Sequence, residues 1–143
     1  MLYTYIFPRY SNAIVPSSLI FSLRILFGVL LMMHGFDKLN NYDALVTAFP
    51  SVLGLGSRIS LLLILFVELV CSLAFIVGFL YRLAILPMIV AMFIAFVWVH
   101  HASVVQGELA FIYLVVFLLL ALTGPGRYSI DNLVYNYISN RCK

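Results

Sequence analysis

The chain has 143 residues, of which 65% are hydrophobic and 9% are charged, with a formal net charge of +3. A soluble domain is about 45–50% apolar, so this composition excludes an ordinary soluble protein and indicates an integral membrane protein in contact with the lipid bilayer. The eight basic residues are scattered singly. That pattern excludes the basic stripe that nucleic-acid binding requires.

The first part of the chain contains an aromatic arm and then an apolar run. Residues 1–16 are predicted to form an N-terminal interfacial arm, because their aromatic side chains favour the level of the lipid headgroups. The first membrane span is predicted over residues 17–36. It contains Arg24 and His34, and a charged group at the centre of a bilayer is costly enough to make Arg24 a candidate for a buried pair.

A more polar loop covers residues 37–56. The second span is predicted over residues 57–79, with Glu68 as the acid near its middle. The third is predicted over residues 83–101, with Pro87 in its second turn, where a proline costs least.

The fourth span needs a separate argument, because its uninterrupted apolar stretch is shorter than the roughly twenty residues that cross a bilayer. We therefore predict that it covers residues 104–123 and carries Glu108 about one turn inside the helix. The remaining residues, 127–143, are predicted to be a polar and aromatic cytoplasmic tail.

Four spans place both termini on one side of the membrane. The basic residues near that side outnumber those near the other, and positive residues favour the cytoplasm. We therefore predict an all-α antiparallel four-helix bundle over residues 17–126, with both termini cytoplasmic. The basic residues on the predicted inner side are Arg9, Arg82, Arg127, Arg141 and Lys143, and those on the outer side are Lys38 and Arg58.

Helix rise predicts which polar groups meet. Arg24 is expected about 10 Å from the inner boundary, and Glu68 about 13–18 Å from it. An arginine side chain spans that difference, so we predict a buried Arg24–Glu68 pair. Such a pair is either a structural staple or part of a functional site, and the sequence leaves both readings open.

A second polar layer is predicted near the outer face. His34 and His100 are expected about 25 Å from the inner boundary and Glu108 about 22 Å from it. Lys38 lies one turn above His34. Together they predict a ligand-binding pocket that opens outward above the Arg24–Glu68 pair. Three alternatives stay open: a structural hydrogen bond for His34, a Lys38 that snorkels to the headgroups, and His101 facing inward in place of His100.

The pattern of several of these residues resembles that of the DoxX family of small bacterial membrane proteins. The resemblance is carried by Arg24, Gly28, the His34-Gly35-x-x-Lys38-Leu39 motif, Glu68, the run Gly107 to Ala110, and the run Gly124 to Asp131. It implies a four-helix inner-membrane protein related in fold to the small subunit of thiosulfate:quinone oxidoreductase, with redox, sulfur or oxidative-stress partners. The biochemical activity of most members is undefined, so the resemblance does not fix the function.

Three functions follow as hypotheses. The first is an accessory or quinone-interacting subunit of a membrane redox complex without independent activity; the sequence has no flavin, iron–sulfur or dinucleotide motif, so electrons would come through a protein partner. The second is a non-catalytic binding or assembly module. The third is a haem b protein with His34 and His100 as axial ligands, or a metal protein that also uses Glu108. The cofactor, the partner and the oligomeric state, including a homo-oligomer, remain open.

Overall fold

The computed structural model describes residues 17–51 and 54–141, so the arm predicted for residues 1–16 lies outside the described residues. Every regular element among the described residues is a helix. In chain order these are α2 (Ser17–Asn40), α3 (Tyr42–Ala48), α4 (Ser57–Leu65), the π-helical segment η2 (Phe66–Cys71), α5 (Ser72–Val77), α6 (Tyr81–Ile94), the π-helical segment η3 (Ala95–Val99), α7 (Glu108–Thr123) and α8 (Ile130–Arg141).

Within the described part of the chain, three continuous helical stretches are long and apolar enough to cross a membrane: Ser17–Asn40, Ser57–Val77 and Tyr81–Val99. The fourth apolar helix, α7, is shorter. The predictions of an all-helical fold and of a multi-pass membrane protein are therefore confirmed. At about 1.5 Å per residue, α7 measures about 24 Å, which is less than the ~30 Å of a hydrocarbon core.

The start of the fourth apolar helix differs from the prediction. We expected a helix from residue 104, but α7 begins at Glu108 and residues 100–107 form a loop. His101 and Ala102 both have positive φ angles, of 49° and 56°. Two successive left-handed residues end the preceding helix, and the chain then needs several residues of turn before a new helix begins.

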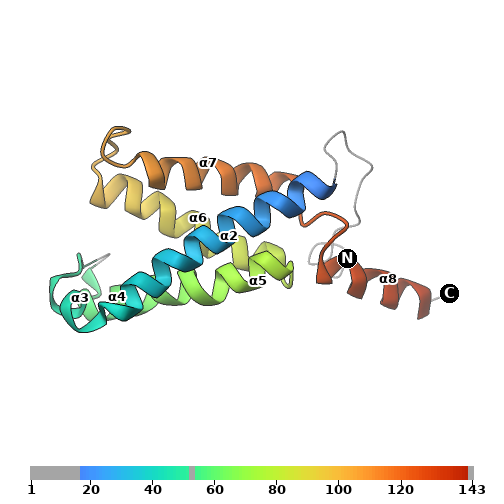
Figure 1. The fold of residues 1–143 in the computed structure, drawn as a ribbon, viewed down its shortest axis with the longest axis horizontal. Helices are drawn as coiled ribbons and strands as arrows, with labels where there is room; N and C mark the ends of the chain where they lie inside the picture. The colour runs from blue at the N-terminus through green and yellow to red at the C-terminus, as the bar shows by residue number, and fades with distance from the viewer. Residues whose placement is uncertain (1–16, 52–53, 142–143) are drawn as a thin grey trace.

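The long helices lie side by side along the long axis of the molecule (Figure 1). Helix α2 packs against η2 and α5, while α6 packs against α5 on one side and α7 on another. Figure 1 shows α3 at one end of the bundle and α8 beyond the other. The core between the helices consists of buried apolar side chains, including Ile20, Leu31, Val67, Phe75, Tyr81, Ile85, Met88, Tyr113 and Phe117.

Glycines let α2 approach its neighbours closely. In a bilayer the lipid is as apolar as the core, so helices associate through close packing and small residues more than through the hydrophobic effect. A Cβ at Gly28 would overlap the Ile76 side chain, and one at Gly35 would lie 2.8 Å from Leu69 Cδ2 and 3.0 Å from Glu68 Cβ. A side chain at either position would force these neighbours to move, so the two glycines allow the close approach.

Arg24 lies fully buried at the α8 end of the bundle. Its guanidinium donates to the carbonyls of Phe75 at 3.1 Å, Ile76 at 2.7 Å, Pro125 at 2.7 Å and Tyr128 at 2.9 Å. The first two belong to the last turn of α5, where the helix dipole favours a cation. Arg24 thus ties α2 to the end of α5 and to the loop after α7.

The prediction that Arg24 pairs with Glu68 is therefore wrong. The prediction assumed that the first two spans begin and end at the same heights. In the structure Arg24 is level with Ile76, and Glu68 lies about 12 Å further along its helix, two turns away. Backbone carbonyls take the place of the carboxylate, and Glu68 pairs with Lys38.

Asp131 holds α8 against the start of α6. Its carboxylate accepts hydrogen bonds from the backbone N–H of Leu80 at 2.8 Å and of Tyr81 at 2.9 Å, and its own N–H donates to the Gly78 carbonyl at 3.0 Å. Burial raises the pKa of the Asp131 carboxyl, while the two backbone donors and Arg24 oppose that rise. A residue about fifty positions away thus caps the N-terminus of α6.

We expect Asp131→Ala to lower the free energy of unfolding by about 1–2 kcal/mol, because α6 loses both acceptors for its first N–H groups. Thermal unfolding of the detergent-solubilised protein measures the change. Asp43→Ala is the matched control, since Asp43 is an exposed acid in the first turn of α3. Equal losses of stability in the two variants would show that Asp131 has no capping role.

Candidate ligand-binding site

A cavity of about 610 Å³ lies at the α3 end of the bundle. Its lining comes from the end of α2, from α3 and the loop after it, from α4 and η2, and from α6 and η3. Most of its lining is apolar, and the polar side chains are those of Lys38, Ser60, Glu68 and His100. A largely apolar cavity with a few polar groups is the usual form of a small-molecule site.

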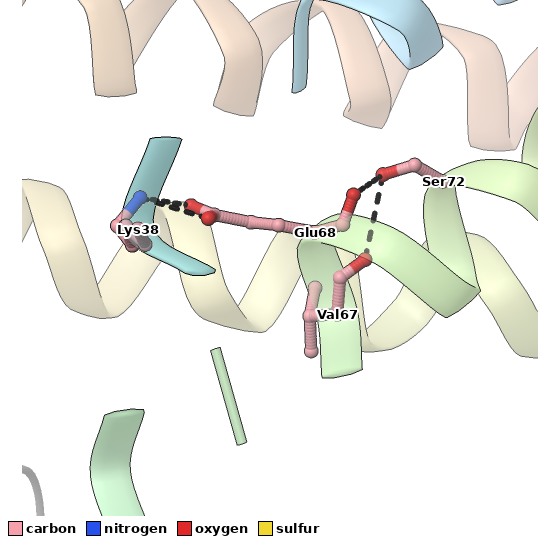
Figure 2. A network of polar contacts seen from close by, with 4 residues as sticks. All are labelled: Lys38, Val67, Glu68 and Ser72. Carbon is pink, nitrogen blue, oxygen red and sulfur yellow. Dashed lines mark hydrogen bonds and ion pairs between the residues drawn. The ribbon is translucent and has the colours of Figure 1, made fainter. Parts of the chain in front are cut away.

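Lys38 and Glu68 both line this cavity. They form the ion pair drawn in Figure 2. The Lys38 ammonium donates to both carboxylate oxygens of Glu68, at 2.7 and 2.8 Å. The Glu68 side chain is 4% exposed and the Lys38 side chain 27%. Two of the three ammonium protons are thus used by Glu68, and the third stays available for another acceptor.

Glu68 lies in the π-helical segment η2 rather than in a regular α-helix. Figure 2 shows Ser72 at the end of this segment, where its hydroxyl donates to the Glu68 carbonyl at 2.6 Å and lies 3.4 Å from the Val67 carbonyl. The Ser72 N–H also donates to the carbonyls of Val67 and Leu69. Ser72 therefore supports the widened turn that carries Glu68. Such π-helical turns occur frequently at functional sites.

The second π-helical segment, η3, ends directly before His100. His100 lines the cavity, whereas His101 is exposed and does not line it. The question which of the two histidines faces inward is thus answered in favour of His100. A Cβ at Gly107 would lie 2.8 Å from His100 Cβ, so the following loop packs closely on this residue.

The structure brings only part of the predicted outer layer together. Lys38 and His100 line the same cavity, but His34 and Glu108 do not. Glu108 is exposed at the start of α7. His34 is exposed as well, and its ring meets the Tyr113 ring edge to face with centroids 6.3 Å apart.

The haem and metal hypotheses lose their support from geometry. His34 does not line the cavity that His100 lines, whereas two axial ligands of a haem would face one space. Among residues 17–51 and 54–141, no group of three or more His, Cys, Asp or Glu side chains could hold a metal ion. The remaining polar groups of the cavity are an ammonium, a carboxylate, an imidazole and a hydroxyl, which suit hydrogen bonding to a ligand and proton exchange with it.

Sequence reasoning missed the roles of Ser72 and Asp131. Ser72 follows the membrane acid by four residues, the spacing at which a serine hydroxyl reaches a helix carbonyl. Asp131 belongs to the run from Gly124 that resembles the DoxX family, but the sequence pattern predicts no role for it. The available signal was that Asp131 is an isolated acid five residues after Gly126, the last glycine of the turn.

Comparison with known proteins bears on the same residues. The DoxX family model matches residues 19–101, which is more than half of the chain and includes Lys38, Glu68 and His100. No curated protein and no solved structure matches the chain significantly. The chain belongs to the DoxX family.

Proposed function

We propose that the cavity binds the headgroup of a quinone, and that the protein is a quinone-interacting accessory subunit of a membrane redox complex. The observation that carries the proposal is the Lys38–Glu68 pair in the wall of an otherwise apolar cavity. A quinone presents hydrogen-bond acceptors on an apolar ring. The free ammonium proton of Lys38 is a donor for one carbonyl, and the imidazole of His100 is a donor for the other.

The chemistry of these side chains supports an accessory role. Lysine, glutamate and histidine donate, accept and transfer protons, and Lys38 holds Glu68 in the buried wall of the cavity. Reduction or oxidation of a quinone also requires electrons, which none of these three side chains supplies. We therefore propose that a protein partner exchanges the electrons and that this chain positions the quinone and its protons.

The proposal includes an orientation in the bacterial inner membrane. We place four antiparallel spans across the bilayer with both termini in the cytoplasm, and the cavity near the outer face. Support comes from the basic residues: Lys38 is neutralised by Glu68, so Arg58 is the remaining basic residue that the sequence assigns to the outer side. The excess of positive charge on the side of Arg82 and Arg127 is correspondingly larger.

Quinone binding can be measured with the intrinsic fluorescence of the protein. Trp98 is the single tryptophan and precedes two residues that line the cavity, Val99 and His100. We expect decylubiquinone to quench Trp98 along a saturable curve in the purified protein. The variant Lys38→Met/Glu68→Leu keeps the volume of both side chains without their charges. It should bind the quinone at least about tenfold more weakly, a loss of about 1.4 kcal/mol.

Arg58→Met is the matched control, because it removes an exposed cation from the start of α4 that does not line the cavity. It should bind like the wild type. Quenching that rises linearly without saturation would indicate simple partitioning into the detergent. That result, or equal affinity in the wild type and the double variant, would overturn the proposed function.

A further inference from the structure

The cavity lies where two membrane helices separate. Helix α6 packs against η2 and α5, and α4 packs against α2, η2 and α3, but α4 and α6 are not an extensively packed pair among the described residues. Figure 1 shows these two helices diverging toward the end that carries α3. The wedge between them is the space that the cavity occupies, since both helices contribute to its lining.

The sides of this wedge are apolar and reach the outer surface of the bundle. Leu63 of α4 and Val90 of α6 both line the cavity, yet they are 52% and 54% exposed. In a membrane-spanning bundle such partly exposed side chains meet lipid acyl chains. Glu68, in contrast, is almost fully buried at the inner wall. The cavity therefore runs from a polar inner end to an apolar edge at the bilayer.

The aqueous end of the cavity is covered by the segment after α2. Leu45 of α3 lines the cavity, as do Phe49 and Pro50 directly after that helix. Figure 1 places α3 at the end of the bundle, beyond the last turn of α2. A ligand that came from the aqueous phase would meet this segment first, whereas a ligand within the bilayer meets the edge between α4 and α6.

We infer that the ligand enters laterally from the bilayer, between α4 and α6. Its hydrocarbon tail then stays in the gap between these helices, while its headgroup reaches Lys38 and Glu68. This inference rests on the proposed function and narrows the ligand to a quinone with a long alkyl or isoprenoid chain. Leu63 and Val90 then select for the tail, because they contact it and do not contact the ring. Lys38 and Glu68 recognise only the headgroup.

A bulky substitution at the lipid-facing edge of the cavity tests binding of the tail separately from binding of the headgroup. We expect Val90→Phe to weaken binding of decylubiquinone by about tenfold, which corresponds to lost contact with about two methylene groups. Ubiquinone-0, which has the same ring without the tail, should bind this variant as it binds the wild type. Leu86→Phe is the control, because Leu86 is an equally exposed residue of α6 that does not line the cavity.

The outcomes distinguish the inference from the proposed function. If Val90→Phe binds decylubiquinone as tightly as the wild type, or loses both quinones equally, sideways entry is overturned while quinone binding stands. If the wild type binds neither quinone, both are overturned. Weakened binding of the tailed quinone alone, with Leu86→Phe unaffected for both, supports the inference.

Discussion

Arg24→Met is expected to abolish the accumulation of folded protein. The guanidinium is fully buried and donates to four backbone carbonyls at 2.7–3.1 Å. Methionine has a similar length but no donor, and each buried polar group left unpaired costs about 1–3 kcal/mol. Even if water reaches some of these carbonyls, the sum is a large part of the 5–15 kcal/mol by which proteins are stable.

The yield of monodisperse protein from membranes, followed by thermal unfolding, measures this effect. Arg24→Lys should be intermediate, because an ammonium keeps the charge but lacks the planar fork that reaches several carbonyls at once. Arg58→Met, an exposed arginine, is the control and should behave like the wild type. An Arg24→Met protein with normal yield and melting would show that the carbonyl contacts contribute little.

The Lys38–Glu68 pair should show unequal effects of its two single variants. Lys38→Met leaves the Glu68 carboxylate, which is 4% exposed, without a partner, and removal of one member of a buried pair costs about 3–5 kcal/mol. Glu68→Leu should cost less, since Lys38 is 27% exposed and can extend its ammonium toward the headgroups. The double variant should recover most of the stability lost by Lys38→Met.

A double-mutant cycle of thermal or denaturant unfolding measures this coupling. A stability loss in the double variant equal to the sum of the two single losses would mean that the two side chains do not interact. The same double variant is the one used to test quinone binding. Its recovery of stability matters there, because it separates loss of binding from loss of the fold.

The membrane helices could be predicted largely from composition and hydropathy. Long apolar runs leave few alternatives to helices, because backbone groups within lipid must be paired inside the segment. The spans expected at residues 17–36, 57–79 and 83–101 correspond to Ser17–Asn40, Ser57–Val77 and Tyr81–Val99. The predicted start of the fourth helix was wrong, because hydropathy carries no information about the two residues with positive φ angles that precede Glu108.

The pairing of the charges could not be predicted in the same way. Depth arithmetic depends on where each helix begins relative to its neighbour, and that offset comes from packing at glycines such as Gly28 and Gly35. An offset of two turns was enough to exchange the partner of Glu68 from Arg24 to Lys38. The backbone carbonyls that bind Arg24 carry no residue-specific signal, so no side-chain pattern indicated them.

The candidate site, too, could be predicted from the sequence only in part. Lys38 and His100 were expected to share a pocket, and both line the cavity. The apolar contribution of α3 and of the edge between α4 and α6 was not foreseen, since it depends on how helices diverge in space. The predicted polar layer also included His34 and Glu108, which do not line the cavity. The prediction used depth in the membrane, and equal depth does not determine the direction in which a side chain points.

The quinone content of the protein purified from its native membrane tests the proposal most directly. Extraction and chromatography of the wild type should recover about one quinone per chain, as expected for a single ligand site, and Arg58→Met should match it. The Lys38→Met/Glu68→Leu protein should carry only the amount found in the surrounding lipid. Equal quinone content in the wild type and the double variant would contradict recognition of the headgroup by the Lys38–Glu68 pair.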